Sequence, residues 1–239
     1  MSHRTTVPYG YSMNAAKHHP HFGQPLCRDD LKNGSLRATY VRSELAALAW
    51  TDRQLERSLE RTLEAGPVGD VWLFAYGSLI WNPLFPFAEK RIARIYGLHR
   101  SFCLWSRLGR GTLERPGLVL GLDQGGSCAG LAYRIAAQDV RDELRLVWRR
   151  EMVTGAYCPT WVRARTPAGA VPAIAFVINH ASSAYARHVL AADAARCIAG
   201  ASGIHGRCAD YLAETARGLR EHGIADHTLH AVEAAMAAL

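Results

Sequence analysis

The chain has 239 residues, of which 49% are hydrophobic and 21% are charged, so it can bury a full core and is not a disordered chain. Its 28 basic and 21 acidic residues are scattered without long runs of one charge, so no nucleic acid partner is expected, whereas an anionic small substrate fits the net charge of +7. No apolar window is long enough to span a membrane and residues 1–23 lack the apolar core of a signal peptide, so no membrane partner and a cytoplasmic location are expected.

The N-terminal part of the chain contains little regular pattern. Residues 1–44 are rich in Gly, Pro, His and Ser, which predicts an irregular arm. His18, His19 and His21 have no Cys or carboxylate partner at helical spacing, so a solvated polar tract is favoured over a metal site. Leucines at helical spacing then predict a helix over Ser43–Ala65, which a Gly-Pro pair ends.

The next segments have the patterns of β-strands. Val71–Tyr76 is continuously apolar, as a buried strand is, and Arg91–Trp105 alternates well enough for one long or two short strands. Gly117–Leu122 and Cys128–Ile135 flank Asp123–Gly126, whose sequence is typical of a hairpin turn.

The second half of the chain is mainly helical. Ala136–Arg150 is predicted as a helix, and Thr160–Arg165 and Ala173–Ile178 as a second hairpin that turns near Pro167. Three further helices are predicted over Ser182–Ala199, Gly206–His222 and Asp226–Ala237. Because strands come first and helices last, the order favours an α+β domain on a mostly antiparallel sheet or barrel over a doubly wound parallel sheet.

A turn interrupts the most hydrophobic run of the chain, VWLFAYGSLIW. A strand that ends in Gly77-Ser78 can turn without a Cβ clash, and its N–H groups can bind a carboxylate or another anion. Tyr76 and Ser78 add hydroxyl groups beside them. These residues alone support a binding loop and a plain bend equally. The motifs of phosphate loops and of the Gly-x-Ser-x-Gly nucleophile elbow are absent.

One carboxylate follows the apolar face of a predicted helix. That face consists of Val140, Leu144, Val147 and Trp148. Glu151 comes three residues later on the same face, where burial raises the pKa of a carboxyl group toward the range useful for proton transfer near neutral pH. A side chain that swings out and pairs with Arg150 or Arg165 is an equally supported alternative.

The cysteines form no CxxC pair. They are Cys27, Cys103, Cys128, Cys158, Cys197 and Cys208. Most lie in apolar segments, which predicts small buried side chains in a reducing compartment. A catalytic Cys–His pair is disfavoured because no cysteine stands in a strand-to-helix elbow beside a base.

Four segments, taken together and in this order, resemble the ChaC-type glutathione-specific γ-glutamylcyclotransferases. They are FAYGSLIWNP (Phe74–Pro83), PGLVLGLDQGGSCAGLAYRI (Pro116–Ile135), RREMVTGAY (Arg149–Tyr157) and Ile198–Asp226. The resemblance implies an α+β fold with a small, mostly antiparallel β-barrel surrounded by helices. It implies a catalytic domain over residues 70–239, preceded by an arm and helix over residues 1–69, and no metal or organic cofactor. A cover on the barrel and an oligomer contact are both open roles for the segment before Asp70.

The resemblance also implies a site and a reaction. The loop that binds the γ-glutamyl group would consist of Tyr76, Gly77, Ser78, Leu79, Ile80 and Trp81, with Tyr211 near the pocket and Glu151 as the catalytic proton acceptor. The substrate would be glutathione, cleaved to 5-oxoproline and cysteinylglycine. Cys208 and Asp210 stand where the family has Asn and Glu. The same cyclisation on other γ-glutamyl amines or amino acids therefore stays open, as does a non-catalytic module that binds a γ-glutamyl ligand.

Overall fold

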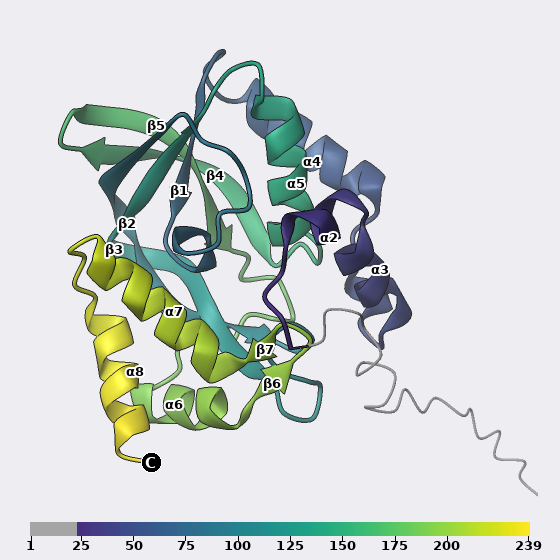
Figure 1. Cartoon of the computed structure of the whole chain (residues 1–239), viewed down its shortest axis with the longest axis vertical. Helices are drawn as coiled ribbons and strands as arrows, with labels where there is room; N and C mark the ends of the chain where they lie inside the picture. The colour runs from purple at the N-terminus through teal and green to yellow at the C-terminus, as the bar shows by residue number, and fades with distance from the viewer. Residues whose placement is uncertain (1–22) are drawn as a thin grey trace, which may run out of the picture.

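The computed structural model describes residues 23–239, so the predictions for residues 1–22, including His18, His19 and His21, lie outside the described residues. In the described part, strands close into a barrel in the order β1-β3-β2-β4-β5 (Figure 1). Their bounds are Val71–Ala75 (β1), Glu89–Ser106 (β2), Gly117–Ile135 (β3), Tyr157–Thr166 (β4) and Gly169–Ile178 (β5). Neighbours in this order are antiparallel, and β5 closes the barrel by parallel pairing with β1. The predicted mostly antiparallel barrel is confirmed.

Strands β2 and β3 form one long ladder, so the predicted hairpin at Asp123–Gly126 is wrong. His99 pairs with Asp123, and Tyr96 pairs with Ser127, on either side of a register shift. Gly125 and Gly126, within β3, have positive φ angles of 94° and 65°. Such angles occur at a bulge in a ladder as well as in a turn. The glycine pair therefore marks a bend in a continuous strand. The predicted hairpin of β4 and β5 is confirmed.

The first long helix, α4 (Asp52–Glu64), begins later than the predicted start at Ser43. Thr51 and Gln54 form a capping box that fixes its first turn, and the leucines before it belong to a short 3-10 turn, η1 (Ala46–Leu48). Helix α4 packs beside α5 (Val140–Glu151). Trp148 of α5, which is fully buried, donates a hydrogen bond of 3.2 Å to the hydroxyl oxygen of Ser58 on α4.

Two short helices replace part of the predicted irregular arm. They are α2 (Arg28–Lys32) and α3 (Ser35–Arg42), and both dock against α5. Arg28 binds both carboxylate oxygens of Glu143 at 2.6 Å, and leucines of α2 and α3 share a small apolar cluster with Leu146. Tertiary contacts rather than local propensity stabilise these helices, which is why the sequence pattern did not reveal them.

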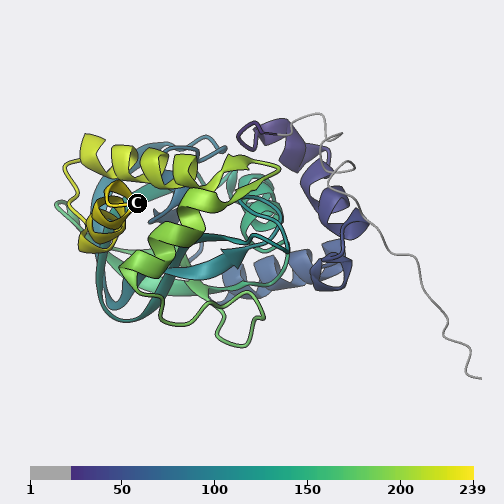
Figure 2. The same cartoon turned by 90° about the horizontal axis from the view of Figure 1, so that it is seen from below.

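The C-terminal helices lie on the opposite side of the molecule from α2 and α3, as Figures 1 and 2 show. They are α6 (Ala191–Gly200), α7 (Cys208–Glu221) and α8 (His227–Ala237), with a small hairpin of β6 (Ser202–Gly203) and β7 (Gly206–Arg207) between the first two. The predictions for α7 and α8 are confirmed. The predicted start of α6 at Ser182 is wrong, because Ala184 and Ala186 form backbone hydrogen bonds of 2.8 Å with the edge of β2.

Three of the six cysteines are buried, and none forms a disulfide. The buried ones are Cys103, Cys128 and Cys208, whereas Cys27 and Cys197 are half-buried. Cys158 is exposed, so the prediction of general burial is wrong for that residue. Among residues 23–239, no helix is both long and apolar enough to cross a membrane.

Candidate active site

The chain bends sharply after β1, where a single 3-10 turn, η2 (Ser78–Ile80), follows Gly77. The amide of Ile80 donates to the carbonyl of Gly77 at 3.0 Å, which closes the turn. Within residues 23–239, the N–H groups of Gly77, Ser78 and Leu79 form no hydrogen bond. Three neighbouring donors are therefore available to a ligand.

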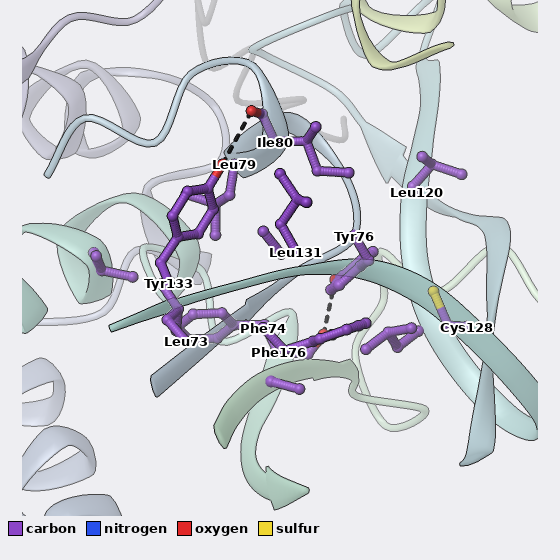
Figure 3. Close-up of a cluster of buried hydrophobic side chains, with 14 of the residues drawn as sticks. Leu73, Phe74, Tyr76, Leu79, Ile80, Leu120, Cys128, Leu131, Tyr133 and Phe176 are labelled. Carbon is purple, nitrogen blue, oxygen red and sulfur yellow. Dashed lines mark hydrogen bonds between the residues drawn. The ribbon is translucent and has the colours of Figure 1, made fainter. Parts of the chain in front are cut away.

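Side chains from the barrel fix the position of this bend. The hydroxyl of Tyr76 donates to the carbonyl of Phe176 at 2.7 Å, and that of Tyr133 donates to the carbonyl of Ile80 at 3.1 Å (Figure 3). A third contact comes from Arg100 of β2, whose Nε donates to the carbonyl of Tyr76 at 2.7 Å. The bend is thus held on both sides before any ligand is bound.

The bend forms one wall of a small cavity of about 20 Å³. Its lining consists of Tyr76, Gly77, Ser78, Leu79, Leu120, Glu151, Tyr157, Phe176 and Tyr211. The structure therefore brings together the bend, Glu151 and Tyr211, which are far apart in the sequence. We call this space the inner cavity.

Ile80 and Trp81 do not line the inner cavity. Ile80 is buried against Gly218 of α7, and the indole nitrogen of Trp81 donates to the hydroxyl of Thr215 at 3.1 Å. These contacts attach the bend to α7. Direct substrate binding by Ile80 and Trp81 stays a prediction.

Glu151 is the last residue of α5, and its side chain is only 14% exposed. Its Oε1 lies 3.0 Å from Nε of Arg150 but is not aligned for a hydrogen bond, and it accepts none from the residues that the structure describes. Burial raises the pKa of Glu151, and the charge of Arg150 opposes this shift. The side chain does not swing out, and Arg165 lies over the ring of Tyr96 instead.

Arg150 is a site residue that the sequence analysis considered only as a partner for Glu151. Its guanidinium is buried and donates to the hydroxyl of Ser78 at 2.8 Å and to the carbonyl of Asn82. Burial lowers the pKa of Arg150, but a guanidinium keeps its charge in proteins. Its neighbour Arg149 donates instead to the carbonyls at the end of α2. The sequence alone could not show which of these two adjacent arginines belongs to the site.

Three tyrosines surround the carboxylate. Tyr157 donates to the carbonyl of Leu120 at 3.1 Å, and the amide of Leu120 donates to the hydroxyl of Tyr211 at 3.2 Å. Burial raises the pKa of Tyr76, Tyr157 and Tyr211, so they are neutral phenols at neutral pH. The sequence analysis missed Tyr157 because its predicted strand started at Thr160.

A larger, more open cleft continues outward from the inner cavity. The two spaces share Ser78, Glu151, Tyr157 and Tyr211. We call this space the outer cleft. Neither Cys208 nor Asp210 lines it or the inner cavity.

The two departures from the ChaC-type pattern therefore face elsewhere. The Sγ of Cys208 lies 3.3 Å from the carbonyl of Leu118 in the core, and Asp210 is exposed. These two positions leave the lining of both spaces unchanged.

Comparisons with known proteins show the family and the fold of this chain. A family model described as ChaC-like protein matches residues 71–239. The glutathione-specific gamma-glutamylcyclotransferase of Escherichia coli (strain K12) is 39% identical over 207 residues, which are 86% of this chain and 89% of that protein. Glutathione-specific gamma-glutamylcyclotransferase 1 of Danio rerio is 28% identical over 175 residues, 70% of this chain and 89% of that protein. The crystal structure of a selenomethionine-labelled gamma-glutamylcyclotransferase specific to glutathione from yeast covers 71% of this chain and 96% of its own, with a TM-score of 0.65 and 20% identity, which shows a common fold.

Proposed function

Because this chain belongs to the ChaC-like protein family, we propose that it is a γ-glutamylcyclotransferase that cleaves glutathione. In this reaction the α-amino nitrogen of the γ-glutamyl group attacks its own γ-carbonyl carbon. The bond from that carbon to the cysteine nitrogen breaks, 5-oxoproline closes, and cysteinylglycine leaves with the proton that the amine gave up.

The observation that carries this proposal is the position of Glu151. Its carboxylate is buried, has an oxygen without a hydrogen bond, and shares the inner cavity with the bend after β1. The substrate ammonium must lose a proton before it can attack, and a carboxylate with a raised pKa is suited to accept that proton near neutral pH. Glu151 then gives this proton to the leaving nitrogen. The second proton, which the ring nitrogen loses as the lactam forms, also ends on the leaving amine, so cysteinylglycine departs as an ammonium.

The bend and Arg150 supply the other polar groups that the reaction needs. The available N–H groups of Gly77, Ser78 and Leu79 are suited to stabilise the oxyanion that develops on the γ-carbonyl. Arg150, with the hydroxyl of Ser78, is suited to hold the α-carboxylate of the γ-glutamyl group. These roles fold the chain so that its nitrogen meets its carbonyl carbon.

The aromatic walls favour a compact, folded substrate. Tyr76, Tyr157 and Tyr211 enclose the inner cavity, and each hydroxyl already has a backbone partner. Rigid walls of this kind restrict the γ-glutamyl chain to bent conformations and keep bulk water away from the carboxylate.

Release of 5-oxoproline from glutathione by the purified Glu151→Gln variant tests this function. Glutamine keeps the shape of the side chain but cannot accept a proton, so we expect a loss of about 10²- to 10⁴-fold in kcat with an intact unfolding transition. Asp142→Asn is the control, because the side chain of Asp142 lies on the same helix and is 83% exposed, and this variant should keep full activity. Turnover by Glu151→Gln at the unsubstituted rate would remove Glu151 from the mechanism.

The choice of amine is tested separately. Turnover of glutathione is compared with turnover of γ-glutamyl-alanine by the same enzyme. Preference for glutathione supports the proposed substrate, whereas equal turnover indicates a general γ-glutamyl cyclotransferase. Binding of both without release of 5-oxoproline indicates a binding module.

A further inference from the structure

The outer cleft extends beyond Ser78, Arg150 and Glu151, the residues of its lining that the proposed cyclisation uses. If the γ-glutamyl group occupies the inner cavity, the leaving amine must extend past Glu151 and Tyr211, which belong to both spaces. The substrate half that determines specificity therefore enters the outer cleft. This inference rests on the proposed function.

Arg110 is a cation in the outer cleft without an acidic partner. It lies in the connection between β2 and β3, is half-buried, and its Cζ is 6.0 Å from the ring centre of Tyr211. Among the described residues, its guanidinium forms one hydrogen bond, to the carbonyl of Arg207 at 3.2 Å, and no carboxylate lies within 4.0 Å of the guanidinium nitrogens.

Three other buried or half-buried arginines lie against carboxylates. Arg28 binds Glu143, Arg100 binds Asp226, and Arg150 contacts Glu151. Partial burial lowers the pKa of Arg110 without removing its charge. An unpaired, partly desolvated guanidinium beside the catalytic space is a ready site for an anionic group of a ligand.

Another part of the lining of the outer cleft comes from the N-terminal segment, residues 23–40. Leu26, Leu36 and Tyr40 contribute its apolar lining, and these residues precede the part of the chain that the family model matches. The amide of Gly23 donates to the carbonyl of Ile204 at 2.8 Å, so the segment runs from the β6–β7 hairpin to α2 on α5 (Figure 1).

We propose that the outer cleft binds the leaving half of the substrate, with Arg110 pairing with the carboxylate at its end and the N-terminal segment forming the apolar wall. The preferred substrates are then γ-glutamyl peptides whose leaving amine ends in a carboxylate. Glutathione fits this class, because it carries one carboxylate for Arg150, which contacts Ser78 where the two spaces meet, and one for Arg110 in the outer cleft. The segment before Asp70 is part of the substrate site.

The test compares glutathione with its glycine-amide form, which lacks only the terminal carboxylate. For the unsubstituted enzyme we expect the KM to be about tenfold or more higher for the amide, with kcat within about twofold. Arg110→Gln should raise the KM for glutathione by a similar factor and should cause no further increase for the amide. Arg107→Gln, on the same connection but bonded to the carbonyl of Ser183, is the control and should change neither value.

The outcomes separate this inference from the proposed function. If the unsubstituted enzyme releases no 5-oxoproline from glutathione, the proposed function is wrong. If it turns over glutathione and the amide with equal KM, the proposed role of Arg110 is wrong. The role is also wrong if Arg110→Gln raises the KM for the amide as much as it raises the KM for glutathione. The comparison of the two peptides needs no variant, so a failure of Arg110→Gln to fold leaves the test intact.

The wall is tested with Tyr40→Ala. Tyr40 is half-buried, and desolvation raises its pKa to about 12, so it is an uncharged part of the wall. The substitution should raise the KM severalfold by the same factor for glutathione and for the amide, because it removes apolar contact rather than charge. An unchanged KM, or a change in kcat alone, would exclude the N-terminal segment from the substrate site.

Discussion

Nε of Arg100 donates a hydrogen bond of 2.7 Å to the carbonyl oxygen of Tyr76, while the same guanidinium is paired with Asp226 at the start of α8. The bend that forms the inner cavity is therefore fixed by a strand and by the last helix. Asp226 also accepts a hydrogen bond of 3.0 Å from the amide of Leu229, so it caps α8. One carboxylate connects helix initiation to the geometry of the site.

Substitution of Asp226 can separate these two roles. Asp226→Asn keeps a side-chain acceptor for the helix cap but removes the charge that pairs with Arg100, whose side chain is 1% exposed. We expect the free energy of unfolding to fall by about 3 kcal/mol for Asn and by about 1 kcal/mol more for Asp226→Ala, as urea unfolding would measure. An Asn variant as stable as the unsubstituted protein would show that Arg100 needs no counter-ion.

The hydroxyl of Ser78 is expected to serve the substrate more than the fold. Arg150 donates to it at 2.8 Å, and Ser78→Ala removes this contact without a change in backbone geometry. The KM for glutathione should rise about tenfold, with a small change in melting temperature. Ser202→Ala, at an exposed position in β6, is the control. Unchanged KM and kcat would make Ser78 a plain turn residue.

Gly77 is expected to be required because of the space in front of it. A Cβ at this position would lie 3.2 Å from the hydroxyl oxygen of Tyr211. Gly77→Ala should therefore lower kcat/KM more than stability, since the bend or Tyr211 must shift. The Tyr211→Phe substitution makes room, so the double variant should lose less activity than the two single losses combined. Fully additive losses would contradict this contact.

The pH dependence of the rate should report the pKa of Glu151. Burial raises this pKa above its ordinary value of 4.5, and only the deprotonated form accepts the proton of the substrate. We expect kcat/KM to fall as the pH drops through the raised pKa. The control Asp142→Asn should leave the pH of this fall unchanged. A flat profile through this range would mean that another group is the base.

Stability should change with pH in the opposite direction. Between the unfolded pKa of Glu151 and its raised folded pKa, the folded protein binds more protons, so its stability is highest below this window and falls as the pH rises through it. The difference in unfolding free energy between the unsubstituted protein and Glu151→Gln should therefore decrease with rising pH, by up to about 1.4 kcal/mol per pH unit. A difference that does not vary with pH would indicate an unshifted carboxyl group.

The features that the sequence predicted well are those with a strong local pattern. The continuous apolar run of β1 and the helical spacing of α7 and α8 led to correct elements. Because Glu151 follows an apolar helical face, a buried carboxylate was one of two equally supported predictions, and its side chain is only 14% exposed. In each case residues close in sequence determine the environment.

The features that the sequence did not predict depend on distant contacts. Gly125 and Gly126 support a turn and a bend equally, and only the pairing of β2 along the whole of β3 decides between them. Helix α2 is too short to form alone and depends on Glu143. No sequence pattern around Arg110 indicates a binding residue. Its place beside Tyr211 of α7 depends on the folding of two segments that are far apart in the sequence.

The inner cavity crosses the seam at which the barrel closes. β1 and β5 pair there through only two residue pairs, Trp72 with Ala173 and Leu73 with Ile174, whereas β2 and β3 share a long ladder. The hydroxyl of Tyr76 crosses the same seam to reach Phe176. Local opening of this seam would therefore disrupt the inner cavity while the long ladder of β2 and β3 stays intact, so we expect turnover to be lost on heating before the protein melts globally.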